Sequence, residues 1–111
     1  QTPEQPNAIK FEQFIFDLLP WARNAIVVEG NPSEVFAPVK NADGAKADTP
    51  TTARRAMVQL HAKWLRRAGA TVADAVPVEI SPLWALDEQQ VRQRLELPVT
   101  IEQPTFFHEE K

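Results

Sequence analysis

The sequence predicts a mixed α and β protein, and three segments carry that prediction. Residues 49–68 repeat apolar side chains at intervals of three and four, which is the period of a helix. Residues 76–80 alternate apolar with polar or small residues, as a half-buried strand does. Residues 25–29, AIVVE, form a β-branched run that a Gly-Asn-Pro turn closes. Helices and strands mixed along one chain indicate the α/β class.

The composition limits the size and the kind of protein. A chain of 111 residues has room for one small domain or part of a larger one, and 43% hydrophobic with 24% charged residues is ordinary for a globular chain. No apolar run approaches the ~18 residues that cross a bilayer. A net charge of −3 leaves no basic surplus for nucleic acid.

Two further features concern the origin of the chain. Cysteine is absent, which excludes disulfides and thiolate metal sites and makes a cytoplasmic location the expectation. The chain begins with Gln1 and shows no signal-peptide pattern. Either an artificially chosen boundary or a cut from a longer protein would explain this start, so the N-terminus is treated as uninformative about targeting.

The first third of the chain is expected to open with a helix. Residues 1–7 are polar and proline-punctuated, which is typical of a lead-in. Residues 8–19 carry apolar side chains at helical spacing, and Pro20 ends the pattern because it lacks the backbone N–H that the helix needs. Phe11 falls on the apolar stripe and is expected in the core, whereas Phe16 falls off it.

Residues 49–68 give the clearest helix of the chain. Thr49 suits the N-cap, Pro50 the first helical position and Gly69 the left-handed C-cap. The apolar stripe consists of Ala53, Met57, Leu60, Trp64 and Ala68. Before this helix, residues 41–48 are expected to form a loop with an Asp-Gly turn.

The C-terminal part is expected to add a short helix and a strand. Asp87 and Gln90 have the spacing of a capping box, so a third helix should follow them. Val99 and Ile101 indicate a last strand.

No self-contained active site is recognisable from residue types alone. His61 and His108 lie far apart in the sequence, and no glycine-rich phosphate loop is present. Lys40 is either a solvated surface lysine or a point charge that reaches a phosphate. Phe16 fits burial against a second layer and stacking on a ligand ring equally well. Arg54 lies near a helix start, where acids are favoured, which indicates a salt bridge or a structural anchor.

Three motifs, taken in order, point to a known family. They are PNAIKFEQFIFD, FAPVKNADGAKADTPTTAR and VEISPL. Together they resemble the C-terminal part of the UDP-N-acetylhexosamine pyrophosphorylases, in the UTP-dependent sugar-1-phosphate uridylyltransferase superfamily. The resemblance covers residues 6–83. Residues 8–111 are accordingly expected to be a C-terminal segment of a catalytic domain, in which residues 84–111 are an unassigned helix and strand.

The resemblance implies a fold and a chemistry. The fold is part of a nucleotide-diphospho-sugar transferase-like mixed sheet with flanking helices. The reaction forms a UDP-sugar and pyrophosphate from UTP and N-acetylglucosamine 1-phosphate, or a related sugar 1-phosphate, with Mg²⁺. By motif, Lys40 matches the lysine that contacts the phosphates, and Phe14 and Phe16 match the aromatic pair on the sugar side. Asn41, in the same motif as Lys40, is expected to bind substrate.

The chain also lacks parts of the family pattern. The glycine-rich UTP loop is missing from it, and the metal-binding parts are expected elsewhere. We therefore expect the chain to be inactive alone and to form one wall of a site that the remainder of a parent polypeptide completes. The alternatives are a non-catalytic binding or interaction module derived from that fold, and a small packing domain. An isolated piece of a larger sheet is expected to self-associate.

Overall fold

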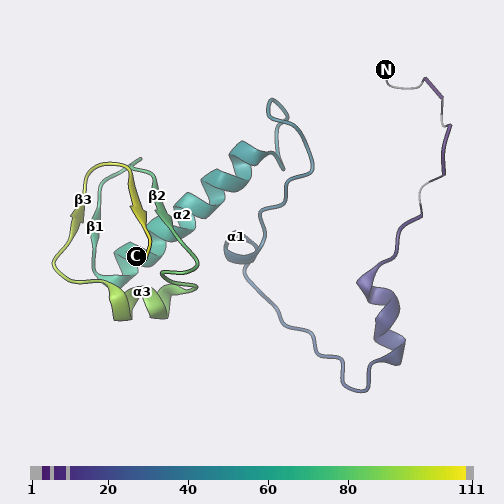
Figure 1. The fold of residues 1–111 in the computed structure, drawn as a ribbon, viewed down its shortest axis with the longest axis horizontal. Helices are drawn as coiled ribbons and strands as arrows, with labels where there is room; N and C mark the ends of the chain where they lie inside the picture. The colour runs from purple at the N-terminus through teal and green to yellow at the C-terminus, as the bar shows by residue number, and fades with distance from the viewer. Residues whose placement is uncertain (1–3, 6, 10, 110–111) are drawn as a thin grey trace.

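The computed structural model describes residues 4–5, 7–9 and 11–109, and it shows a folded body with a long arm (Figure 1). We name residues 49–109 the body, residues 11–39 the arm and residues 40–48 the motif loop. The elements in chain order are the 3₁₀ helix η1 (Ile15–Trp21), α1 (Pro32–Val35), α2 (Pro50–Ala68), β1 (Thr71–Val72), β2 (Val78–Ile80), α3 (Glu88–Arg94), β3 (Thr100–Ile101) and β4 (Thr105–Phe107). These helices and strands confirm a mixed α and β fold.

Helix α2 begins and ends where the sequence predicts. The Thr49 hydroxyl accepts a hydrogen bond from the Thr52 amide at 3.1 Å, and the Thr52 hydroxyl accepts one from the Thr49 amide at 2.9 Å. Pro50 opens the first turn, and Gly69 closes the helix with a left-handed φ of 107°. These caps satisfy backbone groups that helix ends otherwise leave unpaired.

The body has one apolar core, built around α2. β1 pairs with β3 and β2 with β4, both in parallel, and α2 packs against β1, β2 and α3. Leu65 of α2, Val78 of β2 and Val91 of α3 are fully buried. The other buried apolar residues are Ala62, Ala70, Val72, Ile80, Ala85 and Ile101. Full burial of one Val, Leu or Ile side chain contributes roughly 1.5–3 kcal/mol to stability.

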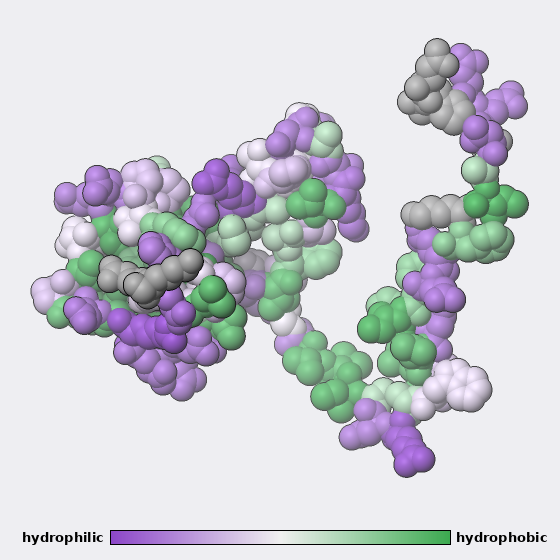
Figure 2. Space-filling model, in the orientation of Figure 1, coloured by the Kyte–Doolittle hydropathy of each residue, from purple (hydrophilic) through white to green (hydrophobic). Residues whose placement is uncertain are grey.

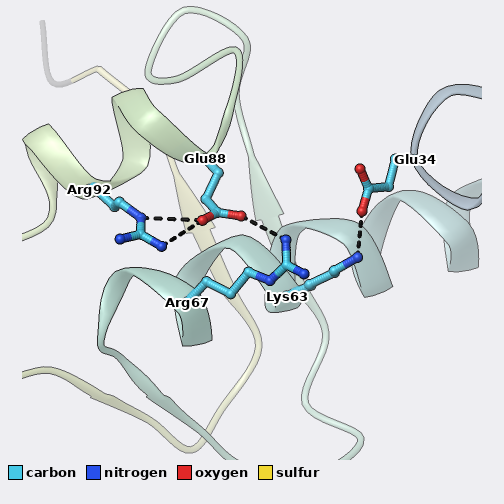
Figure 3. Close-up of polar contacts among 5 residues, drawn as sticks. All are labelled: Glu34, Lys63, Arg67, Glu88 and Arg92. Atoms are coloured by element: carbon cyan, nitrogen blue, oxygen red, sulfur yellow. Dashed lines mark hydrogen bonds and ion pairs between the residues drawn. The ribbon is translucent and has the colours of Figure 1, made fainter. Parts of the chain in front are cut away.

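Two ionic contacts tie neighbouring elements to α2 (Figure 3). Glu88 of α3 accepts hydrogen bonds from Arg92 at 2.7 Å and from Arg67 of α2 at 3.1 Å, and these arginines hold the pKa of Glu88 below its ordinary value. Glu34 of α1 accepts a hydrogen bond from Lys63 of α2. The Arg67–Glu88 contact fixes α3 on α2, and the Lys63–Glu34 contact holds the end of the arm against α2.

The helix expected over residues 8–19 is wrong for the part that the structure describes. Residues 11–14 belong to no helix or strand, and η1 then follows and continues through Pro20. Phe11, expected in the core, is 90% exposed. No residue of η1 is buried. A helix of this length is marginal in water unless its apolar face packs on something, which explains the difference.

The strand expected over residues 25–29 is also wrong. This segment belongs to no strand in the structure, and Val27 is 99% exposed. A strand requires a neighbouring strand for its N–H and C=O groups. With the arm extended, the radius of gyration is 19.5 Å, against about 13 Å for a compact domain of this length.

Most of the elements expected in the C-terminal part are present in the structure. The strand within residues 76–80 is confirmed as β2, and the strand expected at Val99 and Ile101 is confirmed as β3, although β4 follows it in the chain. Asp87 caps α3, because its side chain accepts a hydrogen bond from the Gln90 amide at 2.8 Å. The Gln90 side chain accepts a hydrogen bond from the Leu86 amide and not from the Asp87 amide, so the expected capping box is incomplete. β1 and β4 are not expected from the sequence, because neither Thr71–Val72 nor Thr105–Phe107 shows the alternation of apolar and polar residues that marks β2.

Candidate functional site

The motif loop is closed at its base by hydrogen bonds between its two ends. The amides of Lys40 and Asn41 both donate to the Asp48 carbonyl oxygen, at 2.7 and 2.9 Å. The Asn41 side-chain amide donates to the Ala47 carbonyl at 3.0 Å. Two residues adopt left-handed backbone to complete the turn, Gly44 at φ 103° and Asp48 at φ 57°. The loop therefore presents Lys40 from a fixed backbone.

Asp43 docks the motif loop on the N-terminus of α2. Its Oδ1 accepts a hydrogen bond from the Thr51 amide at 3.0 Å. The Thr51 amide, followed by the Thr51 hydroxyl, lowers the pKa of Asp43 below its ordinary value. A carboxylate at this end of a helix also matches the helix dipole. Because Asp43 and Thr49 already occupy the amides of the first turn, an external anion would have to be bound by side chains.

Lys40 is one of two motif-loop lysines whose side chains are suited to bind such an anion. It is exposed, and its ammonium group has no hydrogen-bond or ion-pair partner among the described residues. Lys46 shares both properties and lies in the same loop. Near the start of α2, Arg54 is engaged, because it donates to Glu79 of β2 at 2.6 Å. Its neighbour Arg55 is exposed and has no partner among the described residues, but it lies on the helix and outside the motif loop. An unpaired ammonium on a fixed backbone can contact a phosphate as a point charge.

The Arg54–Glu79 contact confirms that Arg54 is a structural anchor. Both the Nε and the Nη2 atoms of Arg54 donate to the same Glu79 oxygen, at 3.0 and 2.6 Å. The partner is 25 positions away in the sequence. The pair joins the first turns of α2 to β2, which the sequence could not specify because the two elements meet only in the fold.

The structure does not bring the two aromatic candidates to Lys40. Phe14 precedes η1 and is 58% exposed, and Phe16 lies within η1 and is 69% exposed. In Figure 1 the η1 turn stands apart from α1, α2 and the motif loop. Their place on the sugar side stays a prediction. Asn41 uses its side-chain NH₂ group within the loop, and its carboxamide oxygen has no partner among the described residues.

The two histidines are not part of a reactive cluster. His61 is buried on α2, where its Nδ1 accepts a hydrogen bond from the Ile80 amide at 3.1 Å. Burial lowers the pKa of His61, and the charge of Glu79 acts in the opposite direction. His108 is exposed near the end of β4. Among the described residues, no group of three or more His, Cys, Asp or Glu side chains is placed to hold a metal ion.

An open apolar groove of about 580 Å³ runs between the arm and α2, and we name it the α2 groove. Its lining consists of Ser33, Glu34, Val35, Phe36, Ala37, Val39, Pro50, Ala53, Arg54, Ala56, Met57 and Leu60. The expected stripe of α2 continues into it through Ala53, Met57 and Leu60. The groove and the Asp43 contact were not deducible from spacing alone, because each joins segments that meet only after α2 has formed.

Comparison with known proteins relates the chain to one named group. No protein-family model matches it. It is 50% identical over 72 residues to UDP-N-acetylhexosamine pyrophosphorylase-like protein 1 of Xenopus tropicalis. This match covers 65% of this chain and 14% of that protein. It is 45% identical over 80 residues to UDP-N-acetylglucosamine diphosphorylase 2 of Arabidopsis thaliana, covering 68% and 16%. It is 43% identical over 81 residues to UDP-N-acetylglucosamine pyrophosphorylase of Saccharomyces cerevisiae, covering 71% and 17%.

These matches span 14–17% of the length of the three relatives. Within the part of the chain that the structure describes, no helix combines the length and the apolarity that a membrane crossing requires.

Proposed function

We propose that this chain, which is homologous to a segment of the UDP-N-acetylhexosamine pyrophosphorylases, is part of a nucleotidyltransferase that makes a UDP-sugar. The substrates are UTP and N-acetylglucosamine 1-phosphate, or a related sugar 1-phosphate. The observation that carries the proposal is 43–50% identity to relatives whose names state this class of enzyme. The closed motif loop with its unpaired lysine supports it independently.

The reaction needs charge neutralisation more than it needs a protein nucleophile. An oxygen of the sugar phosphate forms a bond to the α-phosphorus of UTP, while the bond from that phosphorus to the oxygen bridging to the β-phosphate breaks and pyrophosphate leaves. Several anionic oxygens are close together in the transition state. Positioned cations stabilise such a transition state, and no side chain has to form a covalent bond. This is the role we propose for Lys40.

The other sequence candidates have supporting roles in this proposal. Phe14 and Phe16 line the sugar side, where exposed rings can pack on a sugar face. Asn41 contacts substrate through its carboxamide oxygen while its NH₂ group holds the motif loop. The chain alone is inactive, and the rest of a parent polypeptide supplies the grip on UTP.

Mg²⁺ belongs to the proposal as an ion bound outside this chain. The described residues contain no cluster of ligands for it, and Asp43 Oδ1 already accepts a hydrogen bond from the Thr51 amide. The residues that the structure describes therefore do not fit a Mg²⁺ site. No step attributed to them passes through the metal.

Substitution of Lys40 tests the proposal in the full-length protein that contains this segment. Lys40→Ala should reduce the rate of pyrophosphate release from UTP and N-acetylglucosamine 1-phosphate by about 10²-fold or more, the usual effect of removing one charge-stabilising contact. Lys46→Ala is the matched control, because Lys46 is also an exposed lysine of the same loop without a partner among the described residues. It should leave the rate within about twofold of the wild type.

The possible outcomes separate the alternatives. Equal rates for Lys40→Ala and the wild type would remove Lys40 from the site but leave the enzyme class intact. A full-length wild-type protein with no turnover on any sugar 1-phosphate tested would instead support the non-catalytic module.

A further inference from the structure

The chain exposes far more surface than a folded protein of its mass normally does. A folded monomer of 12.5 kDa exposes about 6,200 Å², whereas this chain exposes 9928 Å². The excess is therefore about 3,700 Å² per chain. Permanent protein interfaces bury roughly 2,000–5,000 Å² in total. The excess is thus large enough to supply a stable interface.

The most exposed part of the arm is a short apolar run. Ile26, Val27 and Val28 are 77%, 99% and 82% exposed. Figure 2 shows hydrophobic surface along the arm, well separated from the body, and Figure 1 shows this part of the arm as an extended trace. In extended backbone, alternate side chains point to the same side, so Ile26 and Val28 form one apolar edge. Exposed apolar surface of this extent marks an interaction site.

The α2 groove is the matching surface on the body. It is apolar on both walls and open to solvent, and Met57 within it is 42% exposed. The groove is already partly covered by residues 33–39 of the same arm. A second extended apolar segment can therefore pack beside the first.

Formal charge also favours contact between arm and α2. The arm carries four acidic residues and one arginine, a net charge of −3, whereas α2 carries five basic residues and no acid. The Glu34–Lys63 contact is one instance of such pairing within a chain. Glu79 and Glu88 neutralise Arg54 and Arg67, while Arg55 is exposed and without a partner among the described residues. Opposite charges on two surfaces speed and orient their association.

We infer that residues 25–28 of one copy of this chain occupy the α2 groove of a second copy, and that the exchange is reciprocal. Each copy then contributes an arm and a groove, so that the pair closes on a twofold axis and leaves no groove free. The interface is independent of the proposed reaction, because it uses neither Lys40 nor any other motif-loop side chain.

Site-specific cross-linking tests the contact directly, because the chain contains no cysteine of its own. Val28→Cys and Met57→Cys are made as separate variants and mixed, so that a disulfide joining one of each is necessarily intermolecular. It should form about tenfold faster or more than the disulfide in a mixture of Val28→Cys with Leu83→Cys, because contact raises the effective concentration. Leu83 is the control site, since it is exposed on the body and outside the groove. Equal rates in the two mixtures would overturn the inference.

Sedimentation of the 111-residue chain provides the second test. The wild type should sediment at twice the 12.5 kDa monomer mass. The double variant Ile26→Asp/Val28→Asp and the single variant Met57→Glu should each be monomeric, and Leu83→Asp should remain dimeric. Met57→Glu retains a good helix former, and circular dichroism confirms that α2 persists. A monomeric wild type, open-ended aggregates, or a dimer that only Leu83→Asp dissociates would each contradict reciprocal exchange.

Discussion

At the scale of the residue, the side chains of the motif loop differ in role: Asn41 and Asp43 hold the structure of the loop, whereas Lys40 offers a charge for chemistry. Asn41 and Asp43 form hydrogen bonds that shape the loop and dock it on α2. Lys40 contributes its backbone amide to the loop base, while its ammonium group has no partner among the described residues. A substitution at Asp43 therefore acts by moving the loop, whereas a substitution at Lys40 changes the charge that the loop presents.

A second residue, His61, makes the stability of the body change with pH in the mildly acidic range. Its Nδ1 must be unprotonated to accept the hydrogen bond from the Ile80 amide. Burial lowers the pKa of His61 below the ordinary 6.5. The unfolded chain thus takes up a proton at a higher pH than the folded chain does. The free energy of unfolding should fall as the pH drops below about 6.5 toward the folded-state pKa, and it should level off below that pKa.

Urea denaturation between about pH 7 and pH 5 measures this effect. The midpoint should decrease for the wild type, and His61→Gln, which retains an acceptor but does not titrate, should flatten the dependence. The lowered pKa values of Glu34 and Glu88 lie below the ordinary 4.5, so these carboxylates titrate outside this range. A wild-type midpoint that stays constant from pH 7 to pH 5 would exclude His61 as the source of acid sensitivity.

At the scale of the element, α2 organises both the core and the motif loop. Its buried side packs on β1, β2 and α3, and its first turn receives the loop through Asp43. The caps of α2 are local in sequence, which is why its bounds follow from the pattern Thr-Pro at one end and Gly at the other. The Arg54–Glu79 and Asp43–Thr51 contacts depend on the fold and have no such pattern.

Removal of the N-cap tests how strongly the start of α2 supports the body. Thr49 is 2% exposed, and its hydroxyl accepts the Thr52 amide. Thr49→Ala should lower the free energy of unfolding by about 1 kcal/mol more than Thr49→Ser does, because serine keeps the capping oxygen. Thermal or denaturant unfolding of the two variants compares them. Equal losses would show that the Thr49 methyl group, and not the cap, is what matters.

At the scale of the whole molecule, most of the body could be predicted from the sequence, except β1 and β4, whereas the arm could not. Residues 49–109 carry their own caps, helical period and strand alternation, so local rules suffice for α2, β2, α3 and β3. The arm has apolar residues at suitable spacing for a helix and a strand, but both need a surface to pack on. The described chain leaves Phe11 and Val27 exposed instead. Lys40 could be singled out by its motif, whereas only the structure shows that its ammonium group has no partner among the described residues.

The central claim is that the ammonium group of Lys40, whose backbone the motif loop holds in place, contacts the phosphates of the sugar nucleotide. Calorimetric titration of the full-length protein with UDP-N-acetylglucosamine and with uridine, which lacks phosphate, measures this contact most directly. Lys40→Ala should weaken binding of UDP-N-acetylglucosamine by about tenfold or more, equivalent to about 1.4 kcal/mol, and leave uridine binding unchanged. Unchanged affinity for UDP-N-acetylglucosamine, or an equal loss for both ligands, would contradict the account.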